Sequence, residues 1–329
     1  MTLEMLLQFF PEPIRHLVTA QDVSDVMVNA DGGVYADIEG RLEHRFTVPR
    51  LNLIGIQNIA RTLGSDIDEQ NPILDSRLPD GSRVAAVLSH GELTVTIRKF
   101  NRWYTVEELV ANGTLTTLVR GALGKAVEES ANILISGGTS SGKSTLAKAV
   151  LDLAPSGDRL IVIEKPRELA VSHANAVRWE AREAVPGRPA VTVAQLLVAA
   201  LRHRPDRIVI GEVREPGGAY ELLQAMNTGH RGTLSTIHAD SAEDALYRLA
   251  DLALAAHSNL AASFVRAQVA RTIDYVVHVE RGQQGRRHVT ELVRVQRPHS
   301  GRAEQGAEQF SLEPLFELLE KEEPTYAIH

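Results

Sequence analysis

Apolar runs alternate with amphipathic stretches from about residue 115 to residue 295. Between the runs, apolar residues recur at helical spacing, which predicts helices. The runs are short, rich in β-branched residues and as long as a buried strand, and they cover 132–136, 159–163, 207–211, 233–237 and 274–279. Buried strands that alternate with helices indicate a mostly parallel sheet covered on both faces. We therefore predict an α/β domain over residues 115–296.

The first hundred residues have a different texture. They carry one helical stretch near residues 50–63 and short strand-like runs bounded by turn residues, at 25–28, 33–38, 83–87 and 93–97. This mixture predicts a small N-terminal α+β domain over residues 1–100. Residues 101–114 predict a linker with a short helix after Thr105. The tail over 297–329 is polar and acidic, and within it the segment FSLEPLFELLEKEE at 310–323 predicts a helix.

Composition excludes several classes of protein. A chain without cysteine forms no disulfide and has neither a thiolate nucleophile nor a cysteine zinc site. No run approaches 18 apolar residues, so we expect no transmembrane segment. The start of the chain, with Glu4 and no basic segment, does not predict a signal peptide, and we expect a cytoplasmic location. The net charge of −7 argues against direct, sequence-specific binding of nucleic acid.

Residues 137–145 read GGTSSGKST, and the first eight form a complete G-x-x-x-x-G-K-[ST] loop. An apolar run precedes the loop and a helical pattern follows it, which is the context that this phosphate-binding motif requires. Glycines let backbone N–H groups close around phosphate oxygens at the start of a helix. The predicted nucleotide-binding residues are Gly138, Thr139, Ser140, Ser141, Gly142, Lys143, Ser144 and Thr145. Lys143 is expected to reach the β and γ phosphates, and the Ser144 hydroxyl to bind Mg²⁺. A chance glycine-rich turn is the alternative.

A second buried run, at 207–211, is followed by an acid. Gly211 stands where the aspartate of a Walker B strand usually stands, which leaves Glu212 as the carboxylate. In proteins with a phosphate-binding loop, such a strand runs beside the strand of the loop and offers a carboxylate near Mg²⁺ or its water shell. Taken alone, Glu212 is equally well explained as a solvated residue at a strand end.

The run at 159–163 also leads into acids, Glu164 and Glu168. The carboxyl ends of parallel strands face the ligand crevice of an open α/β sheet. Glu164 is therefore a candidate for positioning the attacking water. Glu168 is equally well explained as an exposed acid in a loop.

Two histidines, His230 and His238, bracket the run at 233–237. Histidines eight residues apart are poor metal partners without further ligands, so we do not expect zinc. An imidazole that senses the γ-phosphate through hydrogen bonds fits better. A structural role at the strand ends is the alternative. Ser241 and Asp244 together predict the N-terminal cap of the next helix.

The order of these segments resembles one family closely, the secretion ATPases. They are hexameric traffic motors of type IV secretion, conjugation, type II secretion and type IV or Flp pilus assembly. The motifs that carry the resemblance are GGTSSGKST, IEKPREL, RPDRIVIGEVR and TGHRGTLSTIHADS, preceded by SRLPDGSRVAAVL and LTVTIRKF. The resemblance covers roughly residues 20–295 and is nearest to the branch of type IV secretion, conjugation and Flp pili. The four-cysteine zinc module typical of the type II branch cannot exist in a chain without cysteine.

The resemblance implies an N-terminal domain followed by a RecA-like P-loop ATPase domain, with six subunits in a ring. It implies ATP and Mg²⁺ as ligands at the interdomain cleft, and machinery at the inner membrane as the partner. Carried over by position, Glu164 is the acidic-box glutamate, Glu212 is the Walker B glutamate, expected to hold Mg²⁺ through water, and His238 belongs to the histidine box.

Arginines of the N-terminal domain approach the nucleotide in such rings, and Arg83 and Arg98 resemble them. A planar, permanently charged guanidinium suits a transferring phosphoryl group. Surface arginines at a domain boundary are the alternative. Arg202, Arg204 and Arg214 are weaker candidates for the same role.

The chain departs from the family pattern at Lys165. The acidic box usually reads Glu-Asp-x-x-Glu, and Lys165 takes the place of the aspartate. A cation there is expected to lower the pKa of Glu164 or to reorganise the binding of Mg²⁺, unless Lys165 faces solvent and alters nothing. Two hypotheses follow, a hexameric ATP-hydrolysing motor and a nucleotide-responsive assembly scaffold with little turnover. A motor acting directly on DNA is a third, disfavoured by the acidic balance.

Overall fold

The computed structural model describes residues 2–38, 41–99, 103–184, 187–257, 259–282, 285–297, 309–318 and 326–328. The chain divides into two compact units, residues 1–102 with 283–286, and residues 103–282 with 287–329. The predicted domain limits at residues 100, 114 and 296 stay predictions, because contacts alone do not establish a folding unit. Within the described ranges, no helix is both long and apolar enough to cross a membrane.

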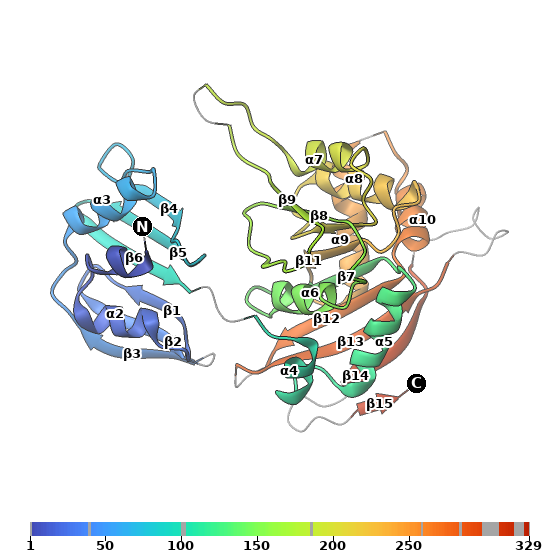
Figure 1. The fold of residues 1–329 in the computed structure, drawn as a ribbon, viewed down its shortest axis with the longest axis horizontal. Coiled ribbons are helices and arrows are strands. Elements are labelled where there is room, and N and C mark those ends of the chain that lie inside the picture. Colours follow the sequence, from blue (N-terminus) through green and yellow to red (C-terminus); the bar gives the residue numbers. More distant parts are fainter. Residues whose placement is uncertain are drawn as a thin grey trace. The chain divides into compact units, whose positions relative to one another are not determined.

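The first unit is an antiparallel sheet with helices (Figure 1). Its strands lie in the order β3-β2-β1-β6-β5-β4. Their bounds are Val23–Val28 (β1), Gly33–Ile38 (β2), Arg41–Thr47 (β3), Ile73–Arg77 (β4), Arg83–Ser89 (β5) and Glu92–Arg98 (β6). The helices are Leu3–Leu7 (α1), Glu12–Thr19 (α2) and Leu53–Thr62 (α3). All four predicted strands and the predicted helix are present, and α1, α2, β3 and β4 are additions.

Alternation of side chains gives this sheet one buried face. In β5, Val84, Ala86 and Leu88 are buried, whereas the residues between them are partly or fully exposed. The buried residues join side chains of the three helices in a core of their own. A strand with this period has one face packed and the other open.

The second unit contains a nine-stranded sheet in the order β15-β14-β13-β12-β7-β11-β10-β8-β9. The strands from β12 to β9 are parallel, and β13, β14 and β15 are antiparallel additions beside β12. The bounds are Ile133–Gly137 (β7), Leu160–Glu164 (β8), Ala176–Glu180 (β9), Arg207–Ile210 (β10), Leu234–His238 (β11), Tyr275–Arg281 (β12), Arg287–Val295 (β13), Leu312–Leu318 (β14) and Tyr326–Ile328 (β15). The predicted α/β fold is confirmed.

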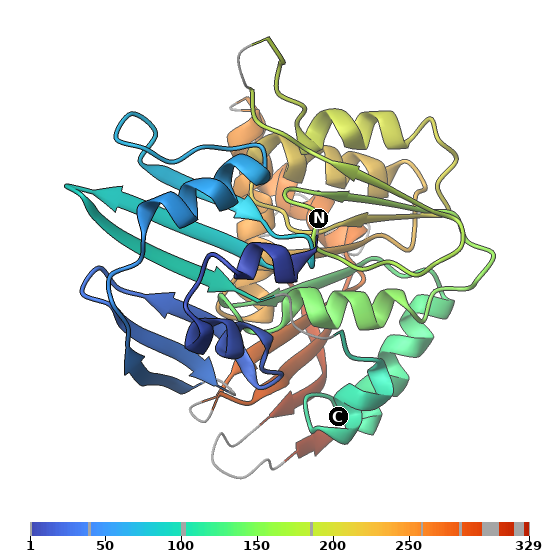
Figure 2. The same ribbon diagram turned by 60° about the vertical axis from the view of Figure 1, so that its left-hand side comes forward.

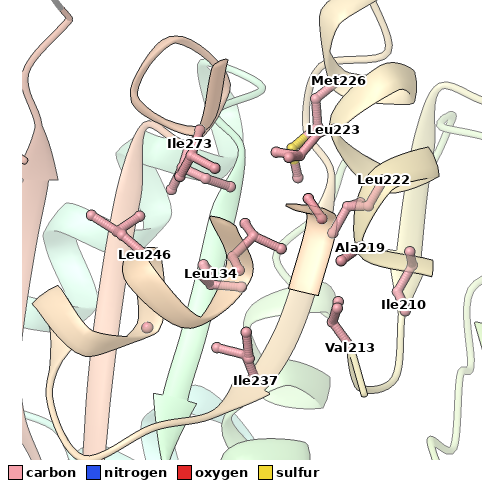
Figure 3. Packing of buried hydrophobic residues seen from close by; sticks show 14 of the residues in the cluster. Leu134, Ile210, Val213, Ala219, Leu222, Leu223, Met226, Ile237, Leu246 and Ile273 are labelled. Atoms are coloured by element: carbon pink, nitrogen blue, oxygen red, sulfur yellow. The ribbon is translucent and has the colours of Figure 1, made fainter. Parts of the chain in front are cut away.

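Helices cover both faces of this sheet (Figure 2). They are Val106–Ala111 (α4), Thr117–Glu128 (α5), Lys143–Leu151 (α6), Val193–Ala200 (α7), Pro216–Asn227 (α8), Ala242–Ala256 (α9) and Ala262–Thr272 (α10). Leu134 of β7 packs with α7 to α10 in one core (Figure 3), whereas Ile133 and Ile135 pack with α4 to α6 in another. Thr105 caps α4 through a capping box with Glu108, as the predicted short helix requires.

The tail contradicts one prediction. Residues 312–318, expected to be helical, form β14, which pairs antiparallel with β13. Pro314 would break the interior of a helix, and Phe316 is buried in the core on the α5 and α6 face when the segment is extended. Pairing with β13 therefore outweighs the helical pattern of the sequence. Residues 319–323 of the predicted helix lie outside the described residues.

Candidate nucleotide site

The predicted site residues of the second unit come together at one edge of the sheet. Gly137 ends β7, Glu164 ends β8 and His238 ends β11, while Glu212 follows β10 by two residues. Because these strands are parallel, their carboxyl ends meet at the same edge, where open α/β sheets bind ligands. His238 lies level with Gly137, since the two residues pair in register. The strand order corrects one expectation: β11 lies between β7 and β10, so Glu212 reaches this edge from two strands away.

The phosphate-binding loop joins β7 directly to α6. Gly137 has φ +154° and Gly142 has φ +101°, which L side chains rarely adopt. A Cβ atom on Gly137 would lie 2.2 Å from the carbonyl oxygen of Val279, so this position has no room for a side chain. α6 begins directly after Gly142 with no side-chain cap on its first N–H groups. Those N–H groups and the helix dipole are what a phosphate group binds.

Lys143 lies in the first turn of α6 with 8% of its surface exposed. Its Nζ donates to the carbonyl oxygens of Gly137, at 2.9 Å, and Gly138, at 2.6 Å. Burial lowers the pKa of Lys143, and the neighbouring Glu212 opposes that shift. The ammonium group is thus folded over the loop, held by backbone carbonyls that phosphate oxygens can replace as partners.

A nucleoside triphosphate fits this arrangement. The Ser141 hydroxyl is buried and has no hydrogen-bond partner among the described residues, and the uncapped N–H groups of α6 add further donors beside it. Mg²⁺ binds through one or two protein oxygens together with phosphate oxygens. Ser144, in the first turn of α6, and Glu212 supply that kind of donor. Within the described ranges, no three His, Asp or Glu side chains gather into a metal site of their own.

Glu164 is a carboxylate buried at the end of β8, with 2% of its surface exposed. Its Oε1 accepts hydrogen bonds from the backbone N–H groups of Glu168, at 2.8 Å, and Leu169, at 2.7 Å. Its Oε2 has no hydrogen-bond partner among the described residues, and the nearest cation, Arg178, is 3.7 Å away. Burial raises the pKa of Glu164, and the two N–H donors limit the rise. A buried carboxylate with a raised pKa is a candidate for a general base.

Gly211 makes room for this carboxylate. A Cβ atom built on Gly211 would lie 2.9 Å from Cγ of Glu164 and 3.4 Å from its Cβ. The aspartate usual at this position would therefore collide with Glu164. The Gly-Glu ending of the strand, read from the sequence as an atypical Walker B motif, is explained by the space that Glu164 occupies. A glycine at 211 leaves Glu212 as the first acid after β10.

Glu212 lies between two cations. The Arg214 guanidinium donates to its Oε2 at 2.6 Å, and Lys143 is close enough for its pKa to respond to Glu212. The pairing raises the pKa of Arg214. Arg214, a weaker candidate for an arginine that approaches nucleotide, therefore contacts the carboxylate that is predicted to hold Mg²⁺.

The two histidines of the histidine box lie at opposite ends of β11. His238 is at the carboxyl edge beside Gly137, whereas His230 lies in the turn before the strand, where its Nδ1 is 3.3 Å from the Thr228 hydroxyl. His238 is thus brought to the phosphate-binding loop and His230 is not. Ser241 caps α9 by accepting from the N–H of Asp244, as predicted.

Comparison with known proteins decides the family. A family model described as "Type II/IV secretion system protein" matches residues 10–314. This chain belongs to the type II/IV secretion ATPase family. It is 33% identical to conjugal transfer protein TrbB of Rhizobium radiobacter over 287 residues, and the aligned part covers 83% of this chain and 84% of that protein. It is 35% identical, over 320 residues, to type IV secretion system protein PtlH of Bordetella pertussis, with 86% of this chain and 94% of that protein covered.

The fold of this secretion-family chain is also found in a solved structure. The pilus retraction motor PilT with bound ADP superimposes with a TM-score of 0.62 at 22% identity, covering 89% of this chain and 84% of that one. This likeness supports the fold alone. The predicted family and fold class are confirmed together.

Lys165 behaves differently from the sequence expectation. Its Nζ lies 2.6 Å from a carboxylate oxygen of Glu183 and 2.6 Å from one of Glu215, at the N-cap of α8. Those partners raise the pKa of Lys165. Lys165 thus joins the segment after β9 to the start of α8 through two ion pairs, neither of them with Glu164.

The arginine candidates separate by position. Arg83 and Arg98 lie opposite each other on β5 and β6 of the first unit, where they pair with Asp75 at 3.3 Å and Asp25 at 2.8 Å respectively. Their approach to nucleotide stays a prediction. Arg202 and Arg204, which precede β10, lie at the amino edge of the sheet, away from the phosphate-binding loop of their own chain.

Three residues that contact the loop, the residue before it or a candidate site residue were missed by sequence reasoning. Arg178 of β9 faces Glu164, Arg287 of β13 donates to the carbonyl oxygen of Ser140 at 3.2 Å, and His278 of β12 lies 2.9 Å from the Ser136 hydroxyl. The sequence carries no signal for Arg178 or Arg287, because both come from strands outside the motifs. His278 was detectable as a histidine inside a buried apolar run, though its partner was not.

Proposed function

We propose that this chain is an ATP-hydrolysing traffic motor that works as a homo-hexamer in a type IV secretion, conjugation or related pilus machine. The observation that carries the proposal is the meeting of Lys143, Glu164, Glu212 and His238 at one sheet edge beside a complete phosphate-binding loop. Family membership supports the choice of machine. We place the motor in the cytoplasm, at the periphery of the inner membrane, because transport across that membrane requires contact with the membrane components.

Each residue has a task in the proposed reaction. The loop N–H groups and Lys143 bind the β and γ phosphates. Ser144 and, through water, Glu212 would hold Mg²⁺, which would neutralise charge on the phosphate oxygens when bound. Glu164 is the proposed general base, which accepts a proton from the attacking water. His238, level with Gly137, hydrogen-bonds the γ-phosphate and reports its loss to β11 and α9.

The alternative of an assembly scaffold with little turnover rested on Lys165 beside the acidic box. The ion pairs of Lys165 with Glu183 and Glu215, and the pKa of Glu164 that burial raises, support the motor instead. The motor is therefore the hypothesis that the geometry supports best.

Steady-state phosphate release under Mg²⁺-ATP separates the two hypotheses. We expect Lys143→Ala to abolish both binding of a fluorescent ATP analogue and turnover. Glu164→Gln is expected to lower turnover by about a hundredfold or more while it still binds nucleotide, because a general base is lost without loss of the loop. Lys125→Ala, an exposed lysine of α5, is the matched control. Wild type no faster than Lys143→Ala would exclude the motor and leave the scaffold.

A further inference from the structure

A histidine is buried directly beside the start of the phosphate-binding loop. His278 has 1% of its surface exposed, and the catalytic scheme above does not use it. Its Nδ1 lies 2.9 Å from the hydroxyl of Ser136, the residue before Gly137. Its Nε2 lies 3.5 Å from a carboxylate oxygen of Glu280. A titratable side chain with two defined partners thus lies on the strand beside the start of the loop.

The backbone of β12 holds the first residue of the loop. His278 and Ser136 pair in parallel register, and the next residue, Val279, presents the carbonyl oxygen that leaves no room for a side chain on Gly137. At this level the register between β12 and β13 shifts between His278 and Val279. Such irregularities re-aim side chains and are found next to active sites. The side chain at 278 therefore influences where Ser136 and Gly137 lie.

Ser136 also faces the histidine box. Its hydroxyl oxygen lies 3.5 Å from the carbonyl oxygen of Ser241, the N-cap of α9, and 3.4 Å from that of Val277. Ser241 follows His238 by three residues. One hydroxyl is thus placed between the phosphate-binding loop and the segment that carries the proposed γ-phosphate sensor.

The single hydrogen of this hydroxyl allows two arrangements. When Nδ1 of His278 is unprotonated, Ser136 donates to it, and neither the Ser241 nor the Val277 carbonyl receives that hydrogen. When Nδ1 carries a proton, His278 donates to Ser136, and the Ser136 hydrogen turns to one of the two carbonyls. The presence of a hydrogen on Nδ1 of His278 therefore selects the partner of Ser136.

Burial favours the neutral imidazole at neutral pH, and Glu280 beside Nε2 favours the tautomer with its hydrogen on Nε2, which leaves Nδ1 as an acceptor. Burial lowers the pKa of His278, and Lys143 acts in the same direction. Glu280, Asp240 and Asp244 oppose the shift without reversing it. Glu291 faces His278 across the β12 and β13 pair, its Oε2 accepts from the N–H of Ala242, and its own pKa is raised by burial.

We propose that His278 is a positioning residue for ATP binding and turnover, which acts through Ser136 to fix the start of the phosphate-binding loop relative to the histidine box. The inference rests on the proposed function, since it assigns a role within the same site. His278 contacts neither nucleotide nor water in this role. Its effect passes through one hydroxyl group.

The first test measures affinity for a fluorescent ATP analogue, together with turnover, at pH 7.5. We expect His278→Leu and Ser136→Ala each to weaken nucleotide binding by about tenfold, the order of one buried hydrogen bond. The double variant should bind nucleotide no more weakly than the weaker-binding of the two single variants, because both substitutions remove the same interaction. His278→Gln keeps an acceptor and should bind within about threefold of wild type. His257→Gln, an exposed histidine after α9, is the control.

The second test is the pH dependence of affinity. As pH falls below about 6.5, the ordinary histidine pKa, wild type should begin to lose affinity as His278 becomes protonated at its lowered pKa. His278→Gln should lack that additional loss, whereas the control should keep it. The inference would be overturned if wild type and His278→Gln had the same pH dependence of affinity. It would also be overturned if the losses of affinity in His278→Leu and Ser136→Ala multiplied in the double variant. Wild type that binds no nucleotide would instead refute the proposed function, so the two failures are distinguishable.

Discussion

At the scale of single residues, the lack of a side chain at Gly211 leaves the space that Glu164 fills. We expect Gly211→Ala to lower turnover by about tenfold or more, because the added Cβ would lie 2.9 Å from Cγ of Glu164 and displace the carboxylate. Nucleotide affinity should stay within about threefold of wild type, since the loop is untouched. Phosphate release and fluorescent-nucleotide titration measure the two effects. The control is Gly124→Ala in α5, where a Cβ meets open space; equal turnover in both variants would refute the steric argument.

The buried environment of Glu164 also predicts a pH dependence. A general base works in its ionised form, so turnover falls as pH drops through the pKa of Glu164. Because burial raises that pKa, the acid limb of turnover should lie above the ordinary glutamate value of about 4.3. The dependence of turnover on pH between 4.5 and 8, measured at saturating nucleotide, locates the limb. A flat profile down to the ordinary value would show that Glu164 is not the base.

Lys165 gives the third prediction at this scale. We expect Lys165→Asp, which restores the family pattern, to lower the free energy of unfolding by about 1 kcal/mol and not to raise turnover, because a third carboxylate then faces Glu183 and Glu215. Urea unfolding and phosphate release measure the two effects, and Lys165→Gln separates loss of the cation from addition of the anion. A faster Lys165→Asp enzyme would mean that the departure limits hydrolysis after all.

At the scale of elements, the pairing of β14 with β13 is the clearest departure from the sequence pattern. Residues 312–318 form a strand in which Phe316 is fully buried, so Phe316→Ala should lower the free energy of unfolding by about 3 to 5 kcal/mol. Leu315→Ala should lower the free energy of unfolding clearly less, because Leu315 is only half-buried. Both tryptophans, Trp103 and Trp179, lie in the second unit, so their fluorescence during urea unfolding reports on that unit. Equal costs for the two variants would contradict the strand.

At the scale of the whole molecule, the chain holds two units with separate cores, and the site described above belongs to the second. The proposed motor needs arginines from the first unit and neighbours in a ring. We expect sedimentation in the presence of Mg²⁺-ATP to give a species six times the chain mass of 36.0 kDa, and Arg83→Ala and Arg98→Ala to lower turnover without loss of that species. A monomer under all nucleotide conditions would contradict the ring.

The sequence by itself determined the fold class, located the phosphate-binding loop and singled out Glu164, Glu212 and His238 as candidates, because period, turn chemistry and motif spacing are local properties. Tertiary structure decided the rest. Strand order placed β11 between β7 and β10, sheet pairing overrode the helical pattern of the tail, and distant partners turned Lys165 away from Glu164. The space that Glu164 takes beside Gly211 and the contact between His278 and Ser136 each involve two strands that are remote in sequence. Contacts of that kind follow from packing, which no local pattern encodes.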